Sequence, residues 1–425
     1  MTVAFYINSF RPDDGFNASS LISGNPGLGG TEYMVMLISY LLQERNNDID
    51  VIMLSSCGEE IEGFKTTKYT PNIKEAISLC EKEGVDYLIF CHDSKFIIDG
   101  SLSVKTCHTR LIPWCHNFIT WKEADYYSKN ESIWRIINVG KEQNELLIDH
   151  PIYSKSEYIF NSVNAEIKCD MSSERRNIVT YMGCIWPSKG FHWLSEVWKD
   201  IVSSVPDAEL YVVGSSKLYG WGNGLGPLGI TEKEYESYIV RPLIVDGHIM
   251  KSVHFMGKLG CEKNEILAKT KVGVSNPTGN TETFCITAVE MQLMGARVIM
   301  GRCPGSLDTV KNGRLIWHKK QLANAIIKEL KADNNGSHNA KAHFEENFSH
   351  ECIVKRWEAL LIGDSLPKKP FNNLFYRLKW LKIAKHSVAR VFPVVYKLPT
   401  VERILTSIER RYFRNFAKYL YTPYQ

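Results

Sequence analysis

Two glutamates in the second half of the chain, Glu282 and Glu290, accompany a helix start in a pattern that suits a hydroxyl-rich ligand. The stretch NPTGNTETFCITAVE (276–290) follows an expected strand and runs into an expected helix from Phe284. First-turn N–H groups of a helix lack partners within the helix. A carboxylate beside such donors accepts hydrogen bonds from vicinal hydroxyl groups. The simpler interpretation is a helix-start charge at Glu282 and a solvated Glu290, about two turns further on.

A glycine-rich loop near the N-terminus is the second candidate for ligand chemistry. The sequence GNPGLGGTE (24–32) follows the first expected strand and opens a helix, where backbone N–H groups can approach an anion. A P-loop needs Lys-Ser/Thr after its second glycine, and Gly30 follows Gly29 here, so that motif is excluded. The spacing also departs from the dinucleotide fingerprint. An ordinary flexible connection remains the alternative interpretation.

The first half of the chain alternates short apolar runs with helical segments. Expected strands are VAFYI (3–7), VIML (51–54), YLIF (87–90), LIPW (111–114) and a strand near Tyr158. Expected helices run from Thr31 to about Gln43 and onward from Lys141. Near-continuous apolar strands separated by helices predict a parallel sheet covered on both faces.

The same alternation restarts after a polar linker at 172–176. Expected strands are IVTYM (178–182), ELYVVG (209–214), SVHFMG (252–257), KVGVSN (271–276) and RVIM (297–300), with helices from Phe191, from Phe284 and from about His338 to Leu361. The predicted fold class is therefore α/β, with two tandem doubly wound Rossmann-like domains facing a cleft and a basic helical C-terminal tail. The predicted boundaries are 1–170, 171–365 and 366–425.

Composition supports a globular chain with an unevenly distributed charge. The 425 residues are 44% hydrophobic and 23% charged, which excludes a disordered or fibrous protein. No apolar run is long enough to span a membrane, and the N-terminus predicts a strand and no signal peptide. The net charge of +4 divides into +11 for residues 366–425, with 13 basic and 2 acidic residues, and −7 for the rest.

The basic tail has the pattern of two amphipathic helices. Apolar residues recur at helical spacing in both; the first set is Leu374, Phe375, Leu378, Leu381 and Val388, and the second is Val401, Ile404, Leu405, Ile408, Tyr412, Phe416 and Leu420. Interleaved lysines and arginines suit an anionic membrane surface, which predicts a peripheral protein on the inner face of a membrane. The alternative is a pair of helices packed on the first domain with solvated basic faces. Nucleic acid is not expected as a partner.

Cysteine and acidic patterns do not predict a metal site. Eleven cysteines without a CxxC pair indicate free thiols in a reducing compartment, hence the cytoplasm. Three Cys-His dipeptides, at 91–92, 107–108 and 115–116, place their side chains on opposite faces of a strand and are poorly suited to chelation. Asp48 and Asp50 match an Asp-x-Asp motif, but lie where a polar connection is expected. Neither a metal nor a cofactor is predicted.

The E-x7-E signature and five further motifs in the family's order resemble the retaining glycosyltransferases of the GT4 type, which have the GT-B fold. Glu282 and Glu290 resemble the family's E-x7-E signature, and Gly29-Gly30-Thr31-Glu32 its GG-x-E loop. The other similar segments are IPWCHN (112–117), YMGCIWPSKGFHWL (181–194), VHFMGKL (253–259) and the loop from Gly305 to Gly313. The resemblance covers about residues 1–360.

The resemblance implies roles for individual residues. Glu290 accepts the ribose hydroxyls of a nucleotide-sugar donor, and Lys189 neutralises the diphosphate leaving group, where negative charge grows in the transition state. Glu282 holds the donor sugar, and His116 hydrogen-bonds its hydroxyls. The implied catalytic set is His116, Lys189 and Glu282; the implied donor-binding set is Gly29, Gly30, Lys189, Phe284, Cys285, Ile286, Thr287 and Glu290. The acceptor is a saccharide or a lipid-linked saccharide.

Two departures from the family pattern affect this assignment. Cys184 stands where the family usually has arginine, five residues before the lysine, which removes one cation from the leaving-group site. Lys217, Lys258 and His192 are the candidates to replace it. Thr283 and Cys285 stand where the family has glycine, which predicts a tighter sugar pocket. Two other functions stay open: a nucleotide-sugar epimerase of the same two-domain shape, and a non-catalytic membrane-associated module with a decayed cleft.

Overall fold

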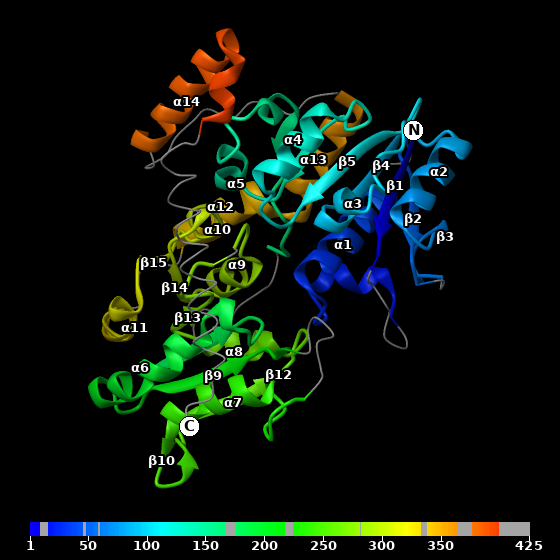
Figure 1. The fold of residues 1–425 in the computed structure, drawn as a ribbon. Coiled ribbons are helices and arrows are strands. Elements are labelled where there is room, and N and C mark those ends of the chain that lie inside the picture. Colours follow the sequence, from blue (N-terminus) through cyan, green and yellow to red (C-terminus); the bar gives the residue numbers. More distant parts are fainter. Residues whose placement is uncertain are drawn as a thin grey trace. The chain divides into compact units, whose positions relative to one another are not determined.

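The computed structural model describes residues 1–8, 16–45, 48–57, 60–165, 176–216, 224–280, 282–332, 338–363 and 376–398. The chain divides into two compact units (Figure 1). Of the described residues, those numbered up to 22, within 30–162 and from 350 onward belong to the first unit, and those within 23–29 and 163–349 belong to the second. Each unit is built around its own parallel sheet.

The first sheet is built from seven parallel strands among the described residues, in the order β3-β2-β1-β4-β5-β6-β7. They are β1 (Thr2–Ile7), β2 (Asp50–Ser55), β3 (Thr67–Tyr69), β4 (Tyr87–Cys91), β5 (Arg110–Cys115), β6 (Ile136–Asn138) and β7 (Ser156–Tyr158). Four strands expected from apolar runs are confirmed, as is the strand near Tyr158. The short strands β3 and β6 were not expected, because three residues are too few to show a pattern.

Helices surround this sheet. They are α1 (Gly30–Arg45), α2 (Ile73–Glu83), α3 (Ser94–Ile98), α4 (Trp121–Lys129), α5 (Lys141–Glu145), α13 (His350–Gly363) and α14 (Tyr376–Val391), with the 3-10 turns η1 (Ala18–Ser23), η2 (Pro151–Lys155) and η7 (Pro393–Lys397). Side chains cap the N-termini of two of these helices. At α2, Asn72 accepts a hydrogen bond from the Glu75 N–H, and at α4, Thr120 and Glu123 form a capping box.

The second sheet has six parallel strands among the described residues, in the order β12-β9-β8-β13-β14-β15. They are β8 (Ile178–Met182), β9 (Glu209–Val213), β12 (Val253–Gly257), β13 (Val272–Val274), β14 (Arg297–Gly301) and β15 (Gly313–Ile316); a hairpin joins β10 (Ile244–Val245) to β11 (His248–Ile249). All five expected strands are confirmed.

Both faces of the second sheet are covered. On β14, Ile299 belongs to one buried apolar cluster, while Val298 and Met300 belong to another, as the two-residue period of a strand requires. The helices are α6 (Phe191–Ser204), α7 (Lys233–Val240), α8 (Lys263–Lys269), α9 (Ile286–Leu293), α10 (Pro304–Thr309), α11 (Leu322–Lys331) and α12 (His338–Phe348), with the turns η3 (Pro187–Lys189), η5 (Arg241–Leu243) and η6 (Lys319–Gln321). The α/β fold class is confirmed.

The single helix expected from His338 to Leu361 is instead two helices, α12 and α13. Between them the backbone leaves the helix, because the Phe348 carbonyl accepts a hydrogen bond from the Val163 N–H and Ser349 forms a parallel bridge with Val163. This break assigns α12 to the second unit and α13 to the first. The predicted boundary at 365 therefore differs from the observed division.

The basic tail is described only from 376 to 398, which contains α14 and η7. Leu374, Phe375 and the second expected helix from Val401 lie outside the described residues. α14 belongs to the first unit, where Lys385 pairs with the buried Asp149 at 3.2 Å. No helix of the described residues is both long and apolar enough to cross a bilayer.

Candidate functional site

Lys189 is the last residue of η3, in the connection that follows β8, and a buried tyrosine holds its backbone. The ring of Tyr181 lies in the core, and its hydroxyl donates to the Lys189 carbonyl at 3.0 Å and to the Cys184 carbonyl at 3.3 Å. Gly190 follows Lys189 in a left-handed conformation with a φ of 74°. A Cβ on this glycine would lie 2.5 Å from Thr278 Cγ2, so only glycine fits between the two loops.

Glu282 accepts two hydrogen bonds that connect the lysine loop with the acidic segment. Its Oε2 lies 2.8 Å from Lys189 Nζ and 2.9 Å from Asn276 Nδ2. Asn276 has a φ of 37°, an uncommon conformation that asparagine tolerates better than most residues. The Lys189 and Glu282 side chains are 24% and 12% exposed, so solvent and ligands can reach both.

Further contacts fix the backbone around Glu282. The Thr278 hydroxyl donates to the Ser188 carbonyl at 2.7 Å, which joins the two loops a second time. The Gly305 N–H donates to the Glu282 carbonyl at 3.1 Å. A Cβ on Gly305 would approach the Thr283 and Glu282 backbone within 3.0 Å, so this glycine permits close packing of α10.

Glu290 forms a separate ion pair with Lys263. The Lys263 Nζ lies 3.0 Å from Glu290 Oε1, and the two side chains are only 8% and 9% exposed. Lys263 opens α8, and Glu290 lies in the second turn of α9. Sequence reasoning missed Lys263, because no motif marks a lysine that lies 27 positions from its partner.

The start of α9 differs from the prediction by two residues. The helix begins at Ile286 with Cys285 as its N-cap, whereas Phe284 was expected as its first residue. Cys285 and Thr287 both contact the Ser275 hydroxyl, at 3.2 and 2.8 Å, so their side chains hold this end of the helix to β13. The backbone N–H groups of Ile286 and Thr287 belong to the first turn, where a helix has unpaired donors.

His116 directly follows β5 in the first unit, so the expected position at a strand end is confirmed. Gln143 holds the backbone on both sides of it: its Nε2 donates to the Cys115 carbonyl at 2.9 Å and to the Asn117 carbonyl at 3.1 Å. Burial lowers the pKa of His116 to about 3, so the imidazole is neutral at pH 7. Gln143 is a second positioning residue that sequence reasoning missed.

The glycine loop is ordered by an asparagine. Asn25 Oδ1 accepts hydrogen bonds from the N–H groups of Gly27 and Leu28 at 2.8 and 2.7 Å. The positive φ angles in this loop belong to Gly24 and Gly27, not to Gly29 and Gly30. Gly30 is the first residue of α1, and Gly29 is the last residue of the loop that belongs to the second unit.

The structure therefore brings Lys189, Glu282 and Asn276 together in one cluster and places Glu290 with Lys263 in another. Comparisons with known proteins show what this region is similar to. Residues 176–332 match the family model Glycosyl transferases group 1. This match confirms the resemblance to glycosyltransferases; the GT4 type and the retaining mechanism stay predictions. A search of the curated proteins found no significant match.

Solved glycosyltransferase structures share the fold of this chain. HepE of Anabaena, solved with UDP and glucose, matches with a TM-score of 0.59 at 15% identity over 85% of this chain and all of HepE. The lipopolysaccharide outer core galactosyltransferase WaaB matches at 0.59 and 12% identity, over 86% of this chain and 100% of WaaB. A glycosyltransferase of Rickettsia africae matches at 0.60 and 13%, over 86% of this chain and 99% of that one.

Three residues were candidates to supply the positive charge of the family's arginine: Lys217, Lys258 and His192. The structure distinguishes between them. Cys184 is buried, which raises the pKa of its thiol to about 11, so it carries no charge at pH 7. His192 is also wrong as a replacement, because burial lowers its pKa to about 4 and its Nδ1 bonds the Tyr235 hydroxyl. Lys217 lies outside the described residues. Lys258 is exposed at the end of β12, and its side chain lies against Gly27.

Among the described residues, no group of three or more histidines, cysteines and acidic residues is arranged to hold a metal ion. The Asp-x-Asp letters fall where a connection was expected, with Asp48 in a turn and Asp50 at the start of β2. All ten described cysteines are free thiols. The dipeptide members Cys91 and Cys115 lie on adjacent strands of the first sheet, and burial raises the pKa of both thiols.

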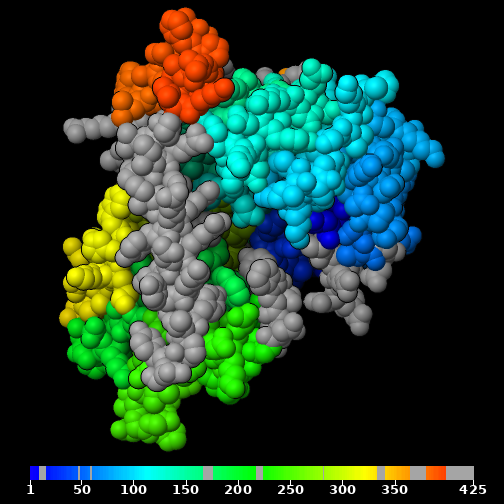
Figure 2. Space-filling model, in the orientation of Figure 1, coloured from blue at the N-terminus to red at the C-terminus, as the bar shows by residue number. Residues whose placement is uncertain are grey.

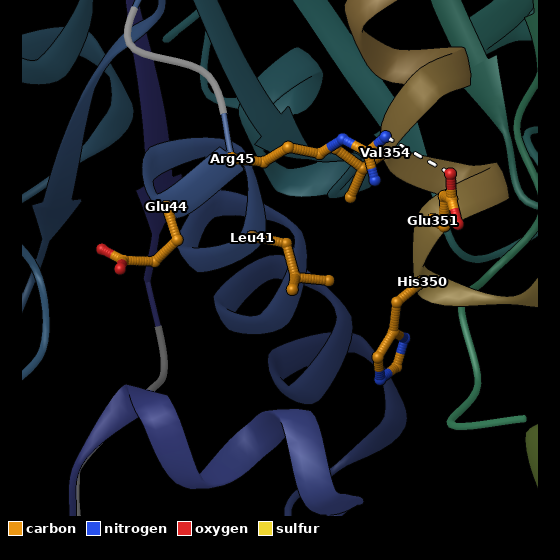
Figure 3. A pocket seen from close by; sticks show the side chains of 6 residues that line it. All are labelled: Leu41, Glu44, Arg45, His350, Glu351 and Val354. Carbon is orange, nitrogen blue, oxygen red and sulfur yellow. Dashed lines mark ion pairs between the residues drawn. The ribbon is translucent and has the colours of Figure 1, made fainter. Parts of the chain in front are cut away.

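A shallow cavity of about 290 Å³ lies between α1 and α13 in the first unit (Figure 3). Its lining residues are Leu41, Glu44, Arg45, His350, Glu351 and Val354. Arg45 lies 3.7 Å from Glu351, a pair that Figure 3 shows at the rim. None of the predicted site residues is among those six, so this cavity is separate from the candidate site.

Proposed function

We propose that the protein is a retaining glycosyltransferase that moves a hexosyl group from a nucleotide-sugar donor to a saccharide or lipid-linked saccharide acceptor, in the biosynthesis of a polysaccharide. The observation that carries this proposal is the cluster of Lys189, Glu282 and Asn276 in a unit that matches the glycosyl transferases group 1 model. HepE, which shares the fold, was solved with UDP and glucose, and this supports a UDP-sugar as the donor class.

The chemistry assigned to the cluster follows from its charges. Transfer breaks the bond between the anomeric carbon and the diphosphate oxygen, forms a bond from that carbon to the acceptor oxygen, and moves the acceptor proton to a base. Negative charge grows on the departing diphosphate, and we assign its stabilisation to the Lys189 ammonium. Glu282 accepts hydrogen bonds from sugar hydroxyls, and the first-turn N–H groups of α9 donate to the donor.

The remaining assignments rest on the resemblance. Glu290 accepts hydrogen bonds from the ribose hydroxyls, and the neutral His116 exchanges a hydrogen bond with a donor-sugar hydroxyl. The mechanism we propose uses Lys189 and the dipole of α9 in place of a divalent metal. We further propose that residues 366–425 bring the protein to the anionic inner face of a membrane, where a lipid-linked acceptor is available.

A panel of UDP-, GDP- and ADP-sugars tests the proposal. The purified chain should release nucleoside diphosphate from one donor, without added metal and in the presence of EDTA, and nuclear magnetic resonance of the product should show the anomeric configuration of the donor. An inverted product would refute the retaining assignment. An epimeric nucleotide sugar formed without acceptor would favour an epimerase. Absence of both binding and turnover across the panel would support a decayed module.

A further inference from the structure

The outward face of α14 is apolar, whereas Lys382 and Lys385 lie on the opposite side. Trp380, Ala384, Leu381, Val388 and Val391 are all exposed and, at 100° per residue, share an arc of roughly 100° on the helix. Trp380 is 61% exposed and Val391 is 71% exposed. Helices at a protein surface ordinarily turn this kind of face toward the core. The arrangement is the reverse of the packed-helix alternative, which placed basic faces in solvent.

The opposite side of α14 holds the helix to the first unit. Lys382 and Ala389 are buried there. Lys385 lies 3.2 Å from Asp149 and 5.2 Å from the Trp121 ring, and it donates to the Leu398 carbonyl at 2.5 Å. Because Asp149 is itself buried, this pair keeps the helix in one orientation. The apolar face is therefore directed outward by specific contacts.

Exposed apolar residues also follow the helix, in and beside η7. Phe392, Val394 and Leu398 are 61%, 68% and 58% exposed. Figure 2 shows the segment 376–398, in orange and red, at the surface beside blue-green residues of the first unit. We call the exposed apolar residues of α14 and η7 the outer strip; they are Trp380, Leu381, Ala384, Val388, Val391, Phe392, Val394 and Leu398. Contiguous apolar surface of this kind marks an interaction site.

We infer that the outer strip is a membrane-docking surface that inserts its side chains into the boundary between headgroups and acyl chains of an anionic bilayer. The strip contains two aromatic residues: Trp380 opens it, and Phe392 directly follows α14. Aromatic residues are typical of helices that lie in the plane of a membrane. The 16 residues of α14 give it a length of about 24 Å for contact along that plane. The inference rests on the proposed function, because it deepens the membrane association proposed for residues 366–425.

Charge favours a lipid surface over the two other possible occupants. Arg390 and Lys397 are exposed beside the strip, and residues 366–425 carry a net charge of +11. A second copy of the chain would bring two such segments together, and the segment 399–425 is itself basic, with 5 lysines and arginines against 2 glutamates. Anionic headgroups supply the opposite charge, and acyl chains supply the apolar partner.

Co-sedimentation of the full-length chain with vesicles tests this surface. Wild type should bind vesicles of 70% phosphatidylcholine and 30% phosphatidylglycerol. The double variant Val391→Asn/Phe392→Asn should lose about tenfold or more in partition coefficient, because two exposed side chains can no longer enter the bilayer. A second variant on the same face, Leu381→Asn/Val388→Asn, should behave alike. The matched control is Ile98→Asn, which changes an 83% exposed apolar residue of α3.

Insertion of apolar side chains also predicts how vesicle binding depends on salt. Raising NaCl to 0.5 M weakens purely electrostatic binding strongly, whereas wild type held by the outer strip should keep measurable binding that the Val391→Asn/Phe392→Asn variant lacks. Equal binding of that variant and wild type, or no binding by wild type, would overturn the inference. A dimer in sedimentation velocity that the variant abolishes would also overturn it and assign the strip to a second copy.

The proposed function fails in a different experiment. Release of nucleoside diphosphate from a soluble donor, measured without vesicles, should be unchanged in both strip variants, because the strip contains none of the residues assigned to the donor site. Vesicle binding without any donor turnover would leave the docking surface intact and refute the glycosyltransferase proposal. Donor turnover without vesicle binding would refute the docking surface and leave the glycosyltransferase proposal intact.

Discussion

The two glutamates of the acidic segment, eight residues apart, have lysine partners in very different surroundings. Glu282 and Lys189 lie on loops, are 12% and 24% exposed, and pair at 2.8 Å. Glu290 and Lys263 lie on two helices, are 9% and 8% exposed, and pair at 3.0 Å. The distances are nearly equal, so the surroundings distinguish the two pairs.

This difference separates a pair that can exchange partners from a pair that supports the fold. Breaking an ion pair near solvent costs little, because water replaces the lost partner. Removing one partner of a buried pair leaves an uncompensated charge in a poorly solvated place. Lys189 and Glu282 are therefore suited to the exchange of partners that our proposal requires of them, while Lys263 holds the Glu290 carboxylate in one position.

The largest expected effect is on the buried pair. Glu290→Ala should lower the free energy of unfolding by about 3–5 kcal/mol, because the Lys263 ammonium is left buried without its partner. Urea titration followed by circular dichroism measures this. The double variant Glu290→Met/Lys263→Met should regain most of the loss. An unfolding free energy of Glu290→Ala equal to that of wild type would show that the pair does not support the fold.

Lys189→Ala should affect turnover and leave stability nearly unchanged. We expect kcat for donor cleavage to fall about 10²–10³-fold, the effect of removing one group that stabilises a developing oxyanion, with an unfolding free energy within about 1 kcal/mol of wild type. Initial rates of nucleoside diphosphate release measure kcat. The control is Lys199→Ala, a surface lysine of α6. A kcat that Lys189→Ala leaves intact would remove Lys189 from the mechanism.

Gly190→Ala tests whether the lysine loop must pack against the acidic segment. The added Cβ would lie 2.5 Å from Thr278 Cγ2, so the variant should lose about 1–3 kcal/mol of unfolding free energy and lower kcat by moving Lys189. Gly84→Ala is the matched control: it has a similar φ of 68° with no atom within 4 Å of the added Cβ. If both variants lost equal stability and kept kcat, the loop contact would have no role in the site.

The smallest expected effect is on stability in mild acid. Burial lowers the pKa of His116 to about 3 and that of His192 to about 4, below the value of about 6.5 for an unfolded chain. As the pH falls below about 6.5, the unfolded chain binds protons that the folded chain does not, so the unfolding free energy should fall between pH 7 and pH 5. His192→Gln should reduce this slope. An unchanged slope in His192→Gln would contradict the assigned pKa.

Strands and motif positions were predictable from sequence, because apolar runs and glycines are local signals. All five expected strands of the second sheet are present, and Lys189 follows β8 as its motif predicts. The pairing of Lys263 with Glu290 was not predictable, since it depends on how α8 packs beside α9. The division of the expected long helix at Ser349 was also missed, because the cause is a hydrogen bond to Val163, far away in sequence.

Orientation was the other limit of sequence reasoning. The tail shows apolar and basic residues at helical spacing, and either face satisfies that pattern when turned outward. The buried Asp149 fixes the orientation of α14 by pairing with Lys385. The two residues are 236 positions apart, so no local sequence pattern indicates that they pair. Similarly, nothing in the sequence around Gln143 indicates that its side chain clamps the backbone on both sides of His116.

Calorimetric titration with UDP tests the central claim, that the acidic segment of the second unit binds a nucleotide donor. Wild type should bind UDP, and Lys189→Ala should weaken binding about tenfold or more by removing the cation assigned to the diphosphate. Glu265→Ala, an exposed glutamate of α8, should bind as wild type does. Equal UDP affinity in wild type and Lys189→Ala would contradict the account.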